Sequence, residues 1–99
     1  MQAPVSSIKV VGKTYQIQER ELLDGNCFGF HNAKELTIQY IPQAEGQLKD
    51  TLLHESLHAL SYAIKLDLSE NQVHGLAAVL IPYLKDNKAF IEWLMHSEV

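Results

Sequence analysis

The fold is decided by residues 43–65, which read QAEGQLKDTLLHESLHALSYAIK. Apolar side chains recur in this stretch at steps of three and four residues: Leu48, Leu52, Leu53, Leu57, Leu60 and Ile64. That spacing forms one stripe of an amphipathic helix. We therefore predict a helix that begins near Gln43 and ends near Lys65.

A second helix is predicted after a short turn. Ser69 offers an N-cap side chain and Gln72 stands three residues later, which is the capping-box pattern. Apolar residues then follow at helical spacing: Val73, Leu76, Ala77, Leu80 and Leu84. Pro82 falls inside this pattern, so we expect it to kink the helix or to end it early.

A short third helix is predicted at the C-terminal end. Asp86-Asn87 indicates a turn with a cap, and apolar residues follow it at helical spacing: Phe90, Ile91 and Leu94. The aromatic and methionine side chains here are expected in the core or in a dimer contact rather than in a ligand pocket: Phe90, Trp93 and Met95.

The chain before this first helix predicts β-structure. Ile8 and Val10 are separated from Tyr15 and Ile17 by Gly12-Lys13, which is typical of a hairpin. The charged stretch 19–26 predicts a loop, since it ends in Asp-Gly-Asn.

A second hairpin is predicted from two apolar runs around a polar turn. Phe28 and Phe30 precede the turn at residues 31–34, and the run 36–41 follows it until Pro42. By the alternation of a strand, one face of that run carries Leu36, Ile38 and Tyr40. Strands first and helices after predict an α+β fold in one domain, residues 1–99: a small antiparallel sheet of two hairpins, then helices.

Composition excludes several classes of protein. With 46% hydrophobic and 20% charged residues, the 99-residue chain is not a disordered one. A net charge of −4 argues against binding of nucleic acid, which favours a basic face. No run of about 20 apolar residues predicts a membrane helix, and the N-terminus lacks the pattern of a signal peptide. A single cysteine cannot form an intrachain disulfide, so we expect a cytoplasmic protein.

One motif in the first predicted helix carries chemistry, the H-E-x-x-H formed by His54, Glu55 and His58. Residues four apart lie one above the other on a helix. Both imidazoles can therefore bind one Zn²⁺ ion. Glu55 follows the first histidine directly, so its carboxylate stands beside the metal, where it can act as general base toward a water molecule. The alternative is a pair of ordinary histidines on a solvated helix face.

Catalytic zinc usually keeps three protein ligands and one open position. Glu70, at the start of the second predicted helix, is the preferred third ligand, because a short connection folds that helix back along the first. A carboxylate at a helix N-terminus is also favourable without any metal. His74 shares the helix face of Glu70, so it competes as the ligand, or it hydrogen-bonds to one.

The residues 53–59, together with 70–82, resemble the core of the ImmA/IrrE-type metallopeptidases, which are minimal gluzincins of bacteria and prophages. The family pattern is H-E-x-x-H, then E-x-x-A-N-x-F-A and an apolar run that closes on Pro. Here Val73 replaces the alanine, His74 the asparagine, and Leu76-Ala77 the Phe-Ala pair. The resemblance covers residues 36–82, and small phage-encoded proteins are closest in size.

The resemblance implies a zinc site made of His54, His58 and Glu70, with Glu55 as general base. It also implies that the strand at residues 36–41 forms the sheet edge along the active-site cleft. A peptide or protein substrate would add to that edge as a further strand.

Other polar side chains have ordinary structural roles as their expected explanation. Three phenols could steady an oxyanion but are expected in the core: Tyr40, Tyr62 and Tyr83. His31 is expected to be solvated in its turn, and Cys27 to be a buried thiol rather than a ligand.

Two functions follow as hypotheses. The first is a zinc-dependent endopeptidase, and the second is a zinc-binding regulatory or binding module without useful hydrolysis. A purely structural zinc site fits less well, because structural sites are closed and H-E-x-x-H leaves a ligand position open.

Overall fold

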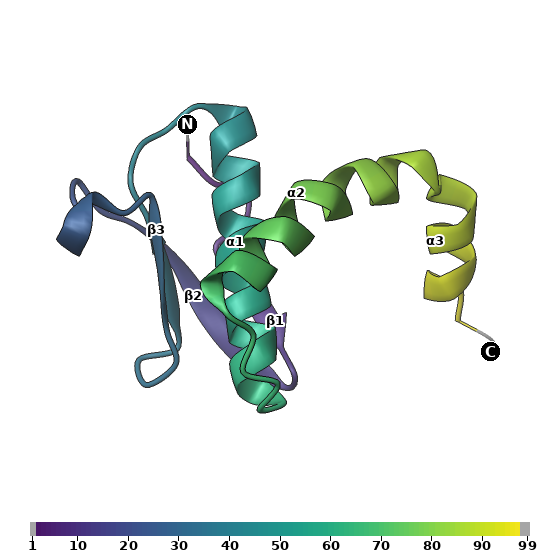
Figure 1. Cartoon of the computed structure of the whole chain (residues 1–99), viewed down its shortest axis with the longest axis horizontal. Coiled ribbons are helices and arrows are strands. Elements are labelled where there is room, and N and C mark those ends of the chain that lie inside the picture. The colour runs from purple at the N-terminus through teal and green to yellow at the C-terminus, as the bar shows by residue number, and fades with distance from the viewer. Residues whose placement is uncertain (1, 98–99) are drawn as a thin grey trace.

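The computed structural model describes residues 2–97 and has the predicted α+β fold, with a four-stranded N-terminal sheet followed by three helices (Figure 1). The elements are β1 (Ser7–Val10), β2 (Lys13–Glu19), β3 (Gly29–Asn32), β4 (Thr37–Tyr40), α1 (Glu45–Ala63), α2 (Glu70–Asp86) and α3 (Lys88–Met95). One turn of 3₁₀ helix, Asp24–Asn26, lies in the predicted loop. No helix of the described chain is long and apolar enough to cross a membrane.

Both predicted hairpins form, but the strands do not pair in chain order. β1 pairs antiparallel with β2, and β3 pairs antiparallel with β4. β2 and β4 then pair in parallel, which gives the strand order β1-β2-β4-β3. The sheet is therefore mixed, and the prediction of an antiparallel sheet was wrong at this pair. The second turn also lies later than predicted, because His31 belongs to β3 and Leu36, with a φ of 55°, belongs to the turn.

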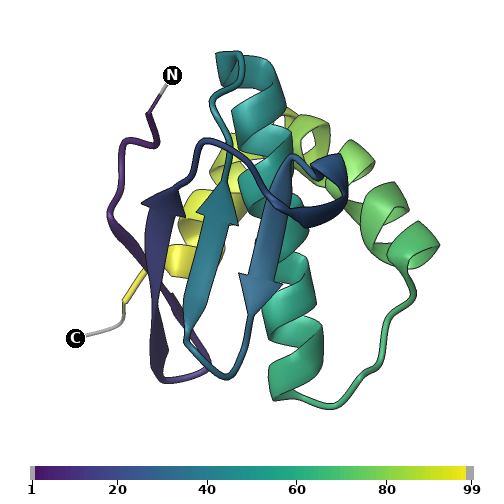
Figure 2. The same cartoon turned by 90° about the vertical axis from the view of Figure 1, so that its left-hand side faces the viewer.

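This order corrects the prediction that the strand at residues 36–41 is the sheet edge. β4 lies inside the sheet, between β2 and β3, and β3 is the edge beside the helices (Figure 2). The prediction came from the resemblance and was wrong, because strand order depends on pairing between distant segments, which no motif within one strand reports.

One face of the sheet packs on α1. Val10, Tyr15, Ile38 and Ala59 form the buried core of this contact. The parallel register places Ile17 beside Ile38, so the inward face stays apolar across the junction of the two hairpins. Tyr40 is also buried, as predicted.

Helix α1 carries apolar residues on two faces rather than in one stripe. Leu48 is buried and Leu52 packs against the core, so this face meets the sheet. Leu60 and Ile64 lie on the opposite face of the helix, where 41% and 60% of their surface is exposed. Steps of three and four residues are compatible with either face, and only the position of the sheet separates them.

Helix α2 begins at the predicted capping box. The Ser69 hydroxyl accepts the backbone N–H of Gln72, and the Gln72 side chain accepts the backbone N–H of Ser69. Pro82 does not end the helix early, since α2 continues to Asp86. Asn87 then separates α2 from α3, as predicted.

Candidate metal centre

The structure brings three of the predicted site residues together at the crossing of α1 and α2. His54 Nε2 lies 2.5 Å from Oε1 of Glu70, and His58 Nε2 lies 3.1 Å from its Oε2. The two imidazole Nε2 atoms are 3.2 Å apart. Both rings are mostly covered, whereas 73% of the Glu70 side chain is exposed.

The connection between α1 and α2 positions Glu70. The Ser61 hydroxyl is buried and accepts the backbone N–H of Leu68, while the Ser61 carbonyl accepts that of Leu66. Lys65 and Asp67 have positive φ angles, which turn the chain back within a few residues. The capping box follows directly, so the first residue of α2, Glu70, is held above the histidines of α1.

The three side chains fit a zinc ion. Their ligand atoms all lie within 4.8 Å of one another, and among the described residues they are the one group of this kind. A tetrahedral site with bonds of 2.0–2.1 Å would place its ligand atoms about 3.3 Å apart. Two imidazoles and a carboxylate are also the donor set of a catalytic zinc site.

His74 lies beside this cluster without belonging to it. Its ring centroid is 6.4 Å from that of His54, and its side chain is exposed on α2. It lines the same surface hollow as His54, Glu55 and Glu70. Of the two candidates for the third ligand, Glu70 is therefore the one placed against both histidines.

Glu55 stands next to the cluster and is partly buried between α1 and β3. Burial raises the pKa of its carboxyl group above the ordinary value. The nearby His54 and His58 oppose this rise, as does the backbone N–H of His31, which the carboxylate accepts, whereas Glu70 adds to it. A carboxyl with a raised pKa holds a proton more readily, which suits a general base.

The pKa of Glu70 is shifted in the opposite direction to that of Glu55. Burial acts to raise its pKa, but hydrogen bonds from His54 and His58 and the charges of these imidazoles outweigh it, and the pKa lies below the ordinary value. Glu70 is therefore a carboxylate at neutral pH, the form that binds a cation.

Gly29 allows β3 to approach α1 beside Glu55. A Cβ atom at this position would lie 2.5 Å from Cγ2 of Thr51 and 3.2 Å from Cγ of Glu55. No side chain fits in that gap without movement of the helix or the strand. This close approach lets the edge strand reach the Glu55 carboxylate with a main-chain donor.

His31 is a residue of this region that sequence reasoning set aside. It is half-buried in β3, and its Nε2 lies 3.1 Å from the Tyr15 hydroxyl. Its ring also meets the edge of Tyr62, with centroids 6.0 Å apart. The pairing of His31 with Ile38 could have been found only from the register of the second hairpin.

The remaining candidates are placed differently from their predictions. Cys27 is exposed rather than buried, and it lines the hollow beside the cluster. Tyr62 and Tyr83 were expected in the core, but 67% and 46% of their surface is exposed. Phe90, Trp93 and Met95 are exposed and do not form core, so of the two predicted roles only the dimer contact stays a prediction.

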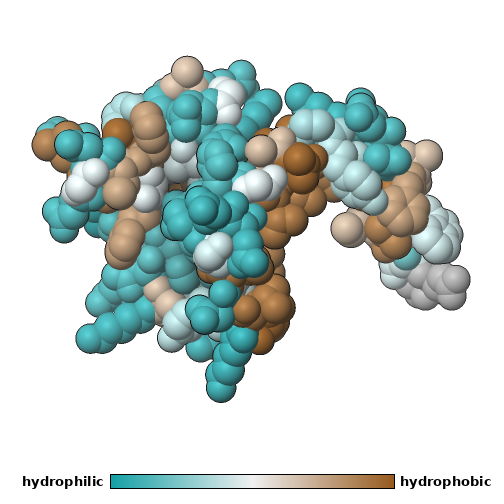
Figure 3. Space-filling model, in the orientation of Figure 1, coloured by the Kyte–Doolittle hydropathy of each residue, from teal (hydrophilic) through white to brown (hydrophobic). Residues whose placement is uncertain are grey.

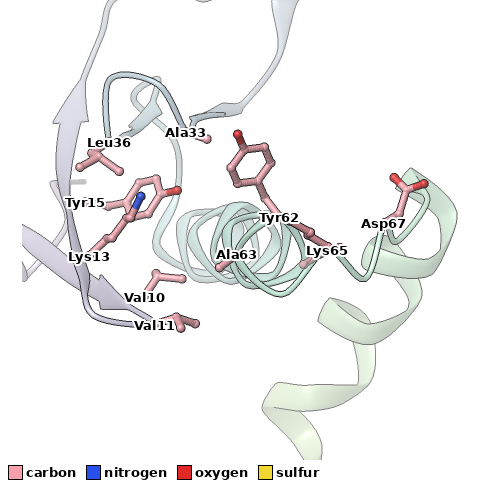
Figure 4. Close-up of a pocket in the computed structure, with 11 residues that line it drawn as sticks. Val10, Val11, Lys13, Tyr15, Ala33, Leu36, Tyr62, Ala63, Lys65 and Asp67 are labelled. Carbon is pink, nitrogen blue, oxygen red and sulfur yellow. The ribbon is translucent and has the colours of Figure 1, made fainter.

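A second cavity, of about 500 Å³, lies at the other end of α1 (Figure 4). Tyr15 lines it from the sheet and Tyr62 from the helix, with Lys13 and Lys65 nearby. Both tyrosines also contact His31, whose backbone N–H reaches Glu55 beside the candidate metal centre. The metal-ligating cluster itself is not part of this cavity.

Comparisons with family models, with curated proteins and with solved structures find no match to this chain. The resemblance to the ImmA/IrrE-type metallopeptidases therefore stays a prediction that rests on the motif residues alone.

Proposed function

We propose that this protein is a zinc-dependent peptidase of the gluzincin type, with His54, His58 and Glu70 as the metal ligands and Glu55 as the general base. The observation that carries the proposal is the convergence of these ligand atoms beside a partly buried carboxyl with a raised pKa. Two imidazoles, one carboxylate and an adjacent unligated glutamate form the set that metal-assisted hydrolysis requires.

A zinc ion held here would acidify water and polarise a peptide carbonyl. Glu55 would take the proton of the attacking water molecule and pass it to the leaving amine. The backbone N–H of His31 fixes the Glu55 carboxylate in place for this transfer. His74, at the rim of the same hollow, would face the substrate rather than the metal.

The substrate in this proposal is a peptide or a protein in extended conformation. Phe28 and Gly29, at the start of β3, line the hollow together with Glu55 and Glu70. Because β3 is the sheet edge, a peptide segment would lie along it and bring a carbonyl group to the cluster. An exposed lone thiol at Cys27 favours action in a reducing compartment, the cytoplasm.

A binding module without useful hydrolysis is the second candidate. It is favoured by the open position of the site, since 73% of the Glu70 side chain is exposed and one small domain forms the whole hollow. Such a module would bind zinc and a protein partner but would not turn over peptides.

The test is metal content by elemental analysis, followed by digestion of a mixed peptide library. The wild type should hold about one zinc per chain and cleave peptides. Glu55→Gln should keep the zinc and lose cleavage by roughly 10²–10⁴-fold. Glu45→Gln, at the exposed first turn of α1, is the matched control and should change neither.

Each other result has a meaning. Zinc bound without cleavage by the wild type would favour the binding module. Turnover retained in Glu55→Gln would remove Glu55 from the mechanism. Zinc lost with His74→Ala and kept with Glu70→Gln would move the third ligand, and no zinc after reconstitution would end the peptidase proposal.

A further inference from the structure

The chain exposes more surface than a globular protein of its mass. Its accessible surface is 7251 Å², whereas a folded monomer of 11.2 kDa exposes about 5,700 Å². Its radius of gyration is 14.2 Å, and a compact domain of this length has one of about 12.6 Å. The excess of roughly 1,500 Å² must lie in some part of the molecule that does not pack against the rest.

The arm formed by the end of α2 and by α3 is such a part. Within the described residues, α3 contacts α2 and no other helix or strand. It points away from the sheet at the far end of α2 (Figure 1). Its apolar side chains are largely exposed: Phe90 46%, Trp93 70%, Leu94 52% and Met95 75%. An isolated eight-residue helix is only marginally stable in water, so a surface that covers this face would stabilise α3.

The same chain also has an apolar surface opposite α3. Leu60 and Ile64 lie on the face of α1 that points away from the sheet, and 41% and 60% of their surface is exposed. Figure 3 shows hydrophobic surface on both sides of the hollow between the body of the molecule and α3. We call α3 the arm helix, and the surface of Leu60 and Ile64 the receiving surface.

We propose that two copies of this chain form a two-fold dimer in which the arm helix of each packs on the receiving surface of the other. One chain supplies both surfaces, so a two-fold axis covers both arms and both receiving surfaces at once. A stable interface covers about 800 Å² per partner, and obligate homodimers cover more. The excess surface of this chain matches that requirement.

The charge of the arm helix does not oppose association with a second copy. The whole chain has a net charge of −4, which would oppose association of like chains. The arm helix carries one lysine and one glutamate, Lys88 and Glu92, so it is neutral and adds no repulsion at the interface. Burial of Trp93 and Phe90 would supply the central aromatic contacts of such an interface.

Sedimentation equilibrium of the full chain over a range of concentrations tests the dimer. The wild type should have twice the monomer mass of 11.2 kDa. Trp93→Glu and Ile64→Lys should each sediment as monomers, because each places a charge in the interface. Leu22→Glu is the matched control, since Leu22 is 80% exposed on the loop before β3, and it should stay dimeric.

Mixing the two monomeric variants tests the arrangement itself. In the mixed dimer, the intact arm of the Ile64→Lys chain meets the intact receiving surface of the Trp93→Glu chain. In the second contact, the glutamate introduced at position 93 of one chain meets the lysine introduced at position 64 of the other. An equimolar mixture should therefore recover the dimer mass, and a mixture that stays monomeric would overturn the arm exchange.

Trp93 is the single tryptophan of the chain, so its fluorescence reports on the arm helix. We expect a blue-shifted emission in the dimer that moves to longer wavelength on dilution. A wild type that stays monomeric at all concentrations overturns the proposal. If its emission is then blue-shifted, the arm has folded onto its own chain, and if it is red-shifted, the arm helix of the isolated chain is uncovered.

Discussion

The crossing of α1 and α2 and the arm formed by α3 are built in opposite ways. At the crossing, polar side chains from two helices contact one another, and no buried side-chain N or O atom of the described residues lacks a hydrogen-bond partner. In the arm, apolar side chains are exposed and have one neighbouring helix. The polar groups at the crossing therefore find their partners within one chain, whereas the apolar side chains of the arm are left exposed to solvent.

This difference separates two kinds of inference. A set of converging polar groups indicates chemistry, because burial of polar atoms is costly unless each has a partner or a ligand. An uncovered apolar face indicates association, because soluble monomers rarely expose a large contiguous apolar patch. The two regions should therefore respond independently to mutation.

The largest expected effect is on zinc affinity, which a substitution at the crossing should lower and a substitution in the arm should not change. Glu70→Gln should weaken zinc binding by more than about 100-fold, since loss even of a group that supports a ligand costs 10–100-fold. Trp93→Glu should leave zinc affinity unchanged. Competition with a chromophoric chelator measures both, with Glu92→Gln on α3 as the control for loss of a carboxylate. Weaker zinc binding in Trp93→Glu would show that the two regions are coupled.

The next largest effect is a difference in the free energy of unfolding between alanine substitutions at two glycines. Gly29→Ala should lower the free energy of unfolding by about 1 to 3 kcal/mol, because the new Cβ would meet Thr51 and Glu55. Gly75→Ala, where a Cβ meets nothing within 4 Å inside α2, should raise it by up to about 1 kcal/mol. Urea unfolding measures both. Equal and small changes would mean that β3 does not lie as close to α1 as the structure has it.

The smallest effect concerns Tyr15. Loss of its hydroxyl contact with His31 in Tyr15→Phe should cost about 1 kcal/mol at neutral pH. Burial, with a smaller contribution from Tyr62, raises the pKa of Tyr15 above 10.0, so the folded state favours the neutral phenol. Its contribution is complete below pH 10 and is lost as the pH rises through the folded pKa. The wild type should therefore lose its advantage over Tyr15→Phe above about pH 10, as urea unfolding at several pH values would show. A constant difference would contradict this.

Most elements of the fold were predictable because their signals are local. The capping box at Ser69 and Gln72 marked the start of α2, and the charged stretch before Asn26 marked a loop. The spacing of His54 and His58 followed from the pitch of one helix. Glu70 could be preferred over His74 only through a resemblance and a short connection, since the sequence does not state the angle at which α2 crosses α1.

What the sequence could not predict depends on contacts between distant segments. The parallel pairing of β2 with β4 moved the sheet edge to β3. The same pairing placed His31 over α1 rather than in solvent, and Gly29 against Glu55. No periodicity within either hairpin reports on which strands of two hairpins will meet.

By itself, the sequence determined the α+β class, the places of both hairpins and all three helices, and the pair of histidines four residues apart, since each depends on neighbours along the chain. Tertiary structure alone decided three further things. It chose β3 as the edge strand, it set Glu70 against both histidines, and it left α3 without cover. The physical reason is the same in each case: these properties belong to the packing of elements on one another, and a helix or strand pattern fixes which face is apolar but not what will cover it.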